Sequence, residues 1–86
     1  MGIGKTVIEL LDLAHSQNKT IYCNGFTGYE FIDISLHDDG SIEIFYVDFE
    51  DYAATWDFKD YNEARQWLTS EDGDGLGEML FDYESK

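Results

Sequence analysis

The chain has 86 residues and carries 19 acidic side chains against 5 basic ones, a formal charge of −14 at neutral pH. This length predicts one domain, and a hydrophobic content of 43% is too high for a disordered chain. The charge excludes a protein that binds DNA or RNA directly, because a polyanion is bound by neutralising its phosphates with Lys and Arg. It also argues against docking on an anionic membrane surface.

The first predicted element is a helix over residues 5–17. Its apolar residues recur at helical spacing, with polar residues opposite: Val7, Ile8, Leu10, Leu11 and Ala14. Thr6 followed by Glu9 is a capping-box pattern, which places the helix start at Thr6. Asn18 is suited to terminate the helix. The residues before Thr6 are expected to be a short flexible lead-in.

Four strands are predicted next, the last with fewer supporting residues than the others. Their ranges are 20–24, 29–36, 41–49 and 52–58. The second and third strands alternate between apolar and polar residues, which is typical of half-buried strands. The segment His37-Asp38-Asp39-Gly40 joins them, and Gly40 suits the left-handed position of a type I turn with a bulge. These patterns predict an antiparallel meander.

The C-terminal part is predicted to be helical. Residues 60–69 form a second helix with Asp60 as its N-cap and Glu63 three residues later. A turn over residues 70–75 precedes a short terminal helix over residues 76–83. The prediction is therefore one α+β domain over residues 1–86, ordered αβββ(β)αα. The helices of such a chain should pack on one face of the three- to four-stranded sheet.

Cysteine and histidine offer little chemistry. Cys23 is the only cysteine, so neither an internal disulfide nor a multi-cysteine zinc site is expected, and a reducing cytosol fits best. It lies in an apolar strand, where an inert buried thiol is the usual case. His15 and His37 have no nucleophile or metal partner at a recognisable spacing. We expect a protein that is not an enzyme and that has no cofactor and no metal.

One segment resembles the start of a calcium loop. With Ser70 as position one, Asp72, Asp74 and Gly75 occupy positions three, five and six, but Phe81 stands where the bidentate Glu belongs. An acidic glycine turn is the favoured interpretation, and a weak divalent site stays open.

The distribution of charge is more informative. No Lys or Arg occurs between residues 20 and 58. Good solubility needs a net charge of only about 2–8 for a small domain, and self-repulsion destabilises a compact fold. Residues on one face of a strand are about 6.6 Å apart, a spacing broadly similar to that of phosphates along DNA. An acidic surface complementary to a basic protein cleft is therefore predicted, and a merely solvated acidic surface is the alternative.

The residues expected to contact such a partner fall into two acidic groups and one aromatic anchor. The carboxylates would pair with Arg or Lys side chains that normally hold phosphates. The first group is Asp38, Asp39, Glu43, Asp48, Glu50 and Asp51; the second is Glu71, Asp72 and Asp74; the anchor is Tyr52.

A capped helix, an acidic meander over residues 29–48 and an acidic helical C-terminus together resemble small phage-encoded anti-CRISPR proteins. The resemblance covers most of the chain, as architecture and charge without a shared motif. It implies an inhibitor that acts as a DNA mimic in the host bacterial cytosol, occupying the nucleic-acid-binding site of a CRISPR effector. Its partner would be a basic nucleic-acid-binding protein, and the inhibitor itself a monomer or a homodimer.

Two other functions stay open. An immunity protein or antitoxin that neutralises a basic nuclease toxin would also bind its target through an acidic surface complementary to a basic one. A generic interaction module could instead bind another protein through exposed aromatic residues, which are common interface anchors.

Overall fold

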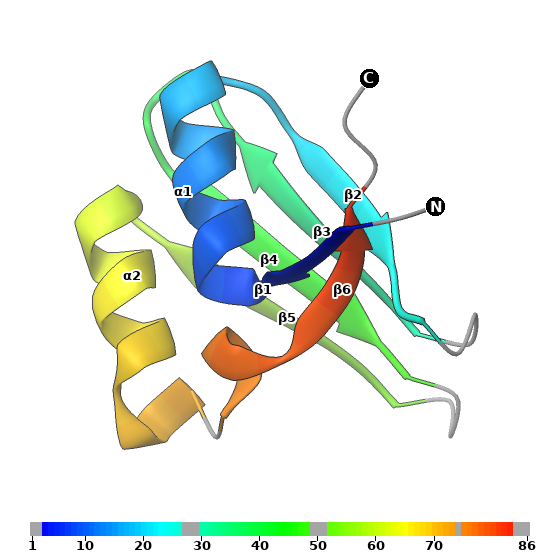
Figure 1. Ribbon diagram of the computed structural model, residues 1–86. Coiled ribbons are helices and arrows are strands. Elements are labelled where there is room, and N and C mark those ends of the chain that lie inside the picture. Colours follow the sequence, from blue (N-terminus) through cyan, green and yellow to red (C-terminus); the bar gives the residue numbers. More distant parts are fainter. Residues whose placement is uncertain (1–2, 27–29, 49–51, 74, 84–86) are drawn as a thin grey trace.

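The computed structural model describes residues 3–26, 30–48, 52–73 and 75–83, and these residues form two helices and a six-stranded antiparallel sheet (Figure 1). The predicted α+β class is confirmed. In chain order the elements are β1 (Ile3–Thr6), α1 (Val7–Gln17), β2 (Ile21–Asn24), β3 (Phe31–Leu36), β4 (Ile42–Val47), β5 (Ala53–Phe58), α2 (Tyr61–Thr69), the 3₁₀ turns η1 (Glu71–Gly73) and η2 (Leu76–Glu78), and β6 (Leu80–Tyr83).

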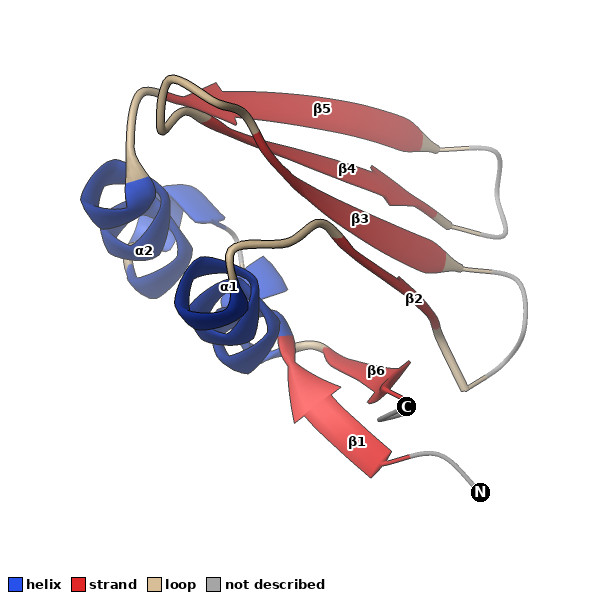
Figure 2. Cartoon of the chain, turned by 90° about the horizontal axis from the view of Figure 1, so that it is seen from above, coloured by secondary structure: helices blue, strands red, loops and turns tan. Residues whose placement is uncertain are grey.

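The sheet has the strand order β1-β6-β2-β3-β4-β5, so the predicted meander β2–β5 forms one side of it. Its register aligns the apolar positions: Ile34 is paired with Ile21 on one side and with Ile44 on the other. Strand β6 joins the meander through the pair Asn24–Asp82. Both helices lie on one face of the sheet, as predicted, and the other face has no helix over it (Figure 2).

The core lies between the helices and the meander. Four apolar residues of α1 are fully buried, Ile8 is partly buried, and the inward residues of the strands meet them. The central residues of this core are Val7, Leu10, Leu11, Ala14, Ile32, Ile34, Ile42, Ile44, Ala64, Leu68 and Phe81. Burying a large aliphatic or aromatic side chain contributes about 1.5–3 kcal/mol, so this cluster dominates the folding free energy.

The predicted helix ends are confirmed. The Thr6 hydroxyl accepts a hydrogen bond from the Glu9 backbone N–H, and the Glu9 carboxylate accepts one from the Thr6 backbone N–H, which completes the capping box. Asn18 ends α1 in the left-handed conformation, with φ 52°. The Asp60 carboxylate accepts from the Glu63 backbone N–H at 2.8 Å and caps α2. Gly40 has φ 90°, as the predicted turn requires.

The prediction for the two chain ends was wrong. Residues 76–83 were expected to be a helix, but only η2 is helical, and Leu80–Tyr83 is strand β6. Residues 3–5, expected to belong to a flexible lead-in, form β1 together with Thr6 and pair with β6. The two segments supply each other's backbone hydrogen bonds, and Phe81 enters the core with none of its surface exposed. The sheet therefore has six strands, not three or four.

The described helices are short, with 11 residues in α1 and 9 in α2. None of them is long and apolar enough to cross a membrane.

Candidate functional site

The meander presents one face without helices, which we call the open face. It consists of the outward side chains of β2–β5, which alternate with the buried ones: Tyr22, Asn24, Phe31, Asp33, Ser35, Glu43, Phe45, Val47, Ala53, Thr55 and Asp57. Three neighbouring strands each contribute one carboxylate to it, and no Lys or Arg belongs to it. The open face is therefore the acidic counterpart of the buried apolar face.

Two of these carboxylates oppose each other directly. Glu43 on β4 is the register partner of Asp57 on β5. Side chains paired in this way have Cβ atoms about 4.5–5.5 Å apart, and like charges there are destabilising. A cation supplied from outside would relieve this repulsion.

Aromatic rings lie beside these acids. Tyr22 stacks on Phe31 with 5.2 Å between the ring centroids, and Phe31 meets Phe45 at 5.7 Å. Tyr22 is 56% exposed. Tyr52 was the aromatic anchor predicted from the sequence, and Tyr22 is a second exposed aromatic residue that was not predicted.

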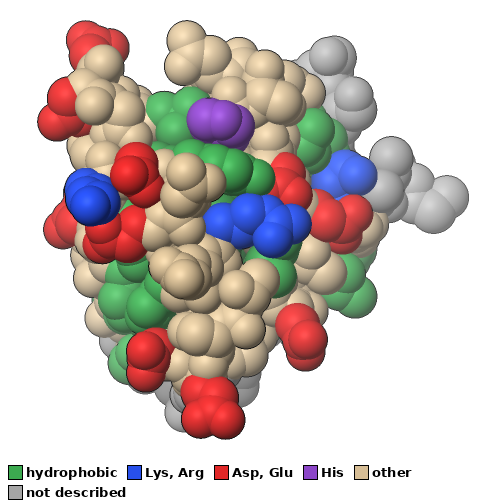
Figure 3. Space-filling view, turned by 90° about the vertical axis from the view of Figure 1, so that its left-hand side faces the viewer, with side chains coloured by type: hydrophobic (Ala, Val, Ile, Leu, Met, Phe, Trp, Pro, Cys, Tyr) green, Lys and Arg blue, Asp and Glu red, His purple; other side chains and the backbone are tan. Residues whose placement is uncertain are grey.

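The described cations lie on other elements. Lys5 is on β1 with its Nζ 5.9 Å from the centre of the Tyr83 ring, Lys19 follows α1 and Lys59 follows β5. On α2 the Arg65 Nε lies 3.1 Å from Asp12 Oδ1. On the side that carries α2, blue cationic and red acidic groups intermingle (Figure 3). Charge is therefore mixed on this side and purely acidic on the open face.

The structure separates the predicted contact residues into several places. Asp38 and Asp39 are exposed in the β3–β4 turn at one end of the sheet. The Asp39 carboxylate accepts hydrogen bonds from the Ser41 hydroxyl at 2.6 Å and the Ser41 backbone N–H at 2.9 Å, and these bonds lower the pKa of Asp39. Asp39 thus also holds the turn together.

Glu43 lies on the open face near the β3–β4 turn, opposite Asp57, and Asp33 lies on the same face of the neighbouring strand. Asp33 and Asp57 were not among the contact residues predicted from the sequence. The signal that could have found them is the alternation itself, since both occupy outward positions of neighbouring strands.

Asp48 and Tyr52 lie at the opposite end of the sheet, where β4 turns into β5. The Asp48 backbone N–H donates to the Tyr52 carbonyl at 2.9 Å, and the Tyr52 N–H donates to Asp48 Oδ1 at 3.2 Å. Strand β4 alone spans about 17 Å at its usual rise, so the two ends cannot meet one small ligand. Glu50 and Asp51 lie outside the described residues.

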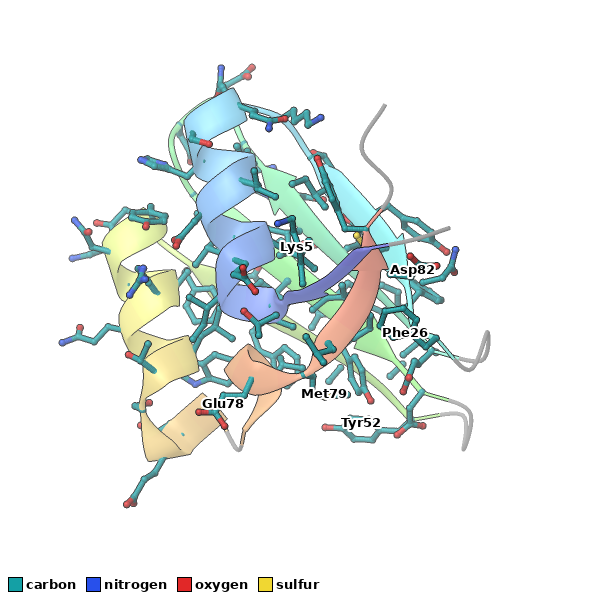
Figure 4. The ribbon with its side chains drawn as sticks, viewed as in Figure 1. Lys5, Phe26, Tyr52, Glu78, Met79 and Asp82 are labelled. Carbon is teal, nitrogen blue, oxygen red and sulfur yellow. The ribbon has the colours of Figure 1, made fainter. Side chains whose placement is uncertain are left out.

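Tyr52 and Asp72, predicted separately, meet in one pocket. The side chain of Tyr52 extends along the lower edge of the molecule (Figure 4). With Asp72 it lines a cavity of about 280 Å³, which we call the aromatic pocket; its walls are Tyr46, Tyr52, Trp56, Trp67, Asp72, Gly73 and Leu76. Sequence reasoning missed Trp56 and Trp67 as site residues. Glu71 is exposed beside Asp72, and Asp74 lies outside the described residues.

The local fold explains how Asp72 reaches this pocket. A Cβ on Gly73 would lie 2.7 Å from the Trp67 carbonyl oxygen, closer than a real Cβ comes to another heavy atom. Only glycine therefore lets η1 close against the end of α2. The Ser70 hydroxyl donates to the Trp67 carbonyl at 2.8 Å and accepts from the Asp72 N–H at 3.3 Å. Together these contacts hold Asp72 beside the Trp67 ring.

The pocket lies in a negative environment. Burial raises the pKa of Tyr46, and the charges of Asp48 and Glu30 raise it further. The part of this rise in pKa that comes from Asp48 and Glu30 reflects negative charge close to the phenol. The wall formed by Tyr46 is therefore favourable for a cation and unfavourable for an anion.

Cys23 and the two histidines lie outside the aromatic pocket. Burial raises the pKa of the Cys23 thiol, and the charge of Asp82 adds to the effect, so the thiol stays neutral. His15 stacks on Tyr61 at 4.0 Å. His15, His37 and Asp60 line a separate cavity of about 580 Å³ near the end of α1. Within the described ranges, no three His, Cys, Asp or Glu residues are grouped so that they could hold a metal ion.

Comparison with family models, curated proteins and solved structures gave no match. The geometry and charge of the chain itself are therefore the basis for a functional proposal.

Proposed function

We propose that this protein is a non-catalytic inhibitor that binds the basic nucleic-acid-binding surface of another protein and excludes nucleic acid from it. The observation that carries the proposal is the separation of charge in the described part of the chain. The open face holds Asp33, Glu43 and Asp57 without a cation, whereas the Lys and Arg residues belong to other elements.

The geometry of the open face suits a phosphate-binding surface. Asp33, Glu43 and Asp57 project side by side from three neighbouring strands, which lie about 4.8 Å apart. A guanidinium or ammonium group that normally holds a phosphate can make charge-assisted hydrogen bonds with such carboxylates. The net charge of −14 would also speed the encounter with a basic partner, since opposite fields steer association.

Binding a basic partner would relieve electrostatic repulsion within the free protein. Glu43 and Asp57 repel each other across the β4–β5 pair, and a partner cation placed between them converts this repulsion into two attractions. The exposed ring of Tyr22 and the row that it forms with Phe31 and Phe45 supply apolar contact beside the charges.

Two classes of target have this chemistry, and both would be met in the bacterial cytosol. If the target is a CRISPR effector, the protein acts like the anti-CRISPR proteins that it resembles. If the target is a basic nuclease toxin, the protein is an immunity protein. An interaction module that binds a non-basic protein through the aromatic row is the competing function.

Affinity capture from bacterial lysate tests the proposal. The immobilised protein should retain a nucleic-acid-binding protein that moderate salt or added DNA releases, and the purified pair should show loss of nucleic-acid binding by the target. Capture of only non-basic proteins that neither salt nor DNA releases would contradict the proposal. The identity of the target then separates an effector from a toxin.

A further inference from the structure

The aromatic pocket brings four rings and one carboxylate together from three parts of the chain. Tyr46 and Tyr52 come from the β4–β5 end of the sheet, with their ring centroids 6.3 Å apart. Trp56 on β5 and Trp67 on α2 lie 5.0 Å apart. Asp72 in η1 completes the wall. Tyr52 is 52% exposed, and both indoles are partly exposed, so these rings are within reach of a ligand from solvent.

Rings and a carboxylate in one pocket select a positive ligand. The face of an aromatic ring is negative and attracts a cation placed over it, most strongly for Trp. Asp72 adds a full negative charge, and Asp48 and Glu30 act on the Tyr46 wall. None of the residues that line the pocket is a cation. The pocket is thus complementary to a cation that the chain itself does not provide.

We infer that the aromatic pocket binds an arginine side chain of the partner protein, stacked on the indole and phenol rings and paired with Asp72. A guanidinium group is planar, is weakly hydrated and stacks on aromatic faces, and its fork of donors matches a carboxylate. The cavity of about 280 Å³ is also large enough for such a head group and its stem.

A groove beside the aromatic pocket can hold the segment of the partner protein that carries the arginine. Glu63, Gln66, Trp67, Ser70 and Asp72 line a shallow hollow of about 380 Å³ beside the end of α2. Trp67 and Asp72 belong to both hollows. A peptide that places an arginine in the pocket can therefore continue past the acidic side chain of Glu63. This inference rests on the proposed function, because it takes the arginine from the basic partner.

The two tryptophans of the chain are Trp56 and Trp67, and both line the pocket, so they report its occupation directly. The probe is N-acetyl-arginine-amide, and its neutral citrulline analogue is the control, added to the full chain at constant ionic strength. The arginine compound should shift both indole N–H resonances and change the fluorescence in a saturable way. The citrulline compound should leave both signals unchanged.

Substitutions test whether the arginine compound binds in the aromatic pocket. Asp72→Asn and Tyr52→Ala should each weaken the response about two- to fivefold, the range for a partly exposed ion pair or cation–π contact. Asp38→Asn, at the other end of the sheet, should leave it unchanged. Equal shifts with arginine and citrulline, no shift with either, or a response that is insensitive to Asp72→Asn would overturn the inference.

Different results would reject the arginine site and the proposed inhibitor function. Capture of a basic partner that is unaffected by Tyr52→Ala and Asp72→Asn would retain the proposed function and reject the pocket as its arginine site. An arginine response without capture of a nucleic-acid-binding protein would retain the cation site and reject the proposed function.

Discussion

At the residue scale, Asp12 joins the two helices. Its carboxylate accepts from the Tyr61 hydroxyl at 2.6 Å and from Arg65 Nε at 3.1 Å. Burial raises the pKa of Asp12, but the hydrogen bonds from Tyr61 and Arg65 outweigh it, so the pKa lies below the ordinary value of 3.8. A lowered pKa in the folded state means that the ionised carboxylate stabilises the fold.

The substitution Asp12→Ala should lower the free energy of unfolding by about 1 kcal/mol at neutral pH, the usual size of one hydrogen bond plus a partly exposed ion pair. The stabilisation is present above the unfolded pKa of an aspartate and disappears as the pH falls through the lower folded pKa. Urea unfolding at neutral pH and near pH 2–3 measures both values. An Asp12→Ala effect that persists undiminished in acid would show that the contact is not electrostatic.

Gly73 controls a second local contact. Gly73→Ala places a methyl group against the Trp67 carbonyl and should cost about 1–3 kcal/mol. Because η1 must move, Asp72 should also leave the aromatic pocket and the tryptophan fluorescence should change. Gly4→Ala is the matched control, since its Cβ would meet the Phe26 ring at 3.4 Å and the Leu80 side chain at 3.9 Å, both ordinary contact distances. Equal stabilities of the two variants would contradict this account.

At the element scale, the terminal strand β6 gives the sharpest contrast between pattern and structure. A helix over residues 76–83 would place Leu80 with Leu76 on its apolar side. In the strand Leu80 is 54% exposed and Phe81 is fully buried. The local sequence is compatible with both arrangements, and the pairing with β1 decides between them.

Alanine substitutions at these two neighbours test the assignment. Phe81→Ala should destabilise the protein by about 3–5 kcal/mol, as expected for a buried aromatic side chain. Leu80→Ala should change the free energy of unfolding by no more than about 0.5 kcal/mol, typical of surface positions. Chemical denaturation followed by circular dichroism measures both. The reverse order of effects would support the helix.

Local patterns sufficed for α1, the meander and α2. Thr6 with Glu9, the alternation around Ile32 and Ile34, and Asp60 with Glu63 each act within a few residues, so they can be read from the sequence. Strands β1 and β6 could not be predicted because each depends on a partner from the opposite end of the chain.

Individual residues of the candidate site could be predicted from the sequence, but their arrangement in space could not. Tyr52 and Asp72 were selected for their exposure and charge, but their meeting depends on η1 closing against α2 and facing the β4–β5 end. Trp56 and Trp67 followed helix and strand patterns typical of core residues, so nothing in the sequence marked them as walls of a pocket. Only the three-dimensional arrangement defines the aromatic pocket.

At the scale of the whole molecule, charge is the dominant feature. A net charge of −14 on 86 residues opposes compaction, and the Glu43–Asp57 pair concentrates part of that repulsion on the open face. Screening weakens repulsion between exposed charges, and the Debye length falls to about 3 Å at 1 M salt. The free protein should therefore gain stability when salt is added.

The thermal midpoint should accordingly rise as sodium chloride is raised from about 0.01 M to about 1 M. The double variant Glu43→Gln/Asp57→Asn should start from a higher midpoint and respond less, because a like-charged cross-strand pair costs roughly 0.2–1 kcal/mol. Differential scanning calorimetry gives both values. A midpoint that falls with salt, or a double variant less stable than the natural chain, would argue against repulsion on the open face.

The central claim is that the acidic open face binds a basic nucleic-acid-binding surface. The most direct test is the dissociation constant of the captured target for three forms of the protein: the natural chain, Glu43→Gln/Asp57→Asn, and the equally neutralised control Glu9→Gln/Glu78→Gln, whose two positions are exposed outside the open face and the aromatic pocket. We predict that the open-face variant binds at least about tenfold more weakly, as loss of close interfacial charge pairs does. The control should stay within about twofold of the natural chain. Equal affinities for all three forms would contradict the claim and leave the acids of the open face as a solvated surface.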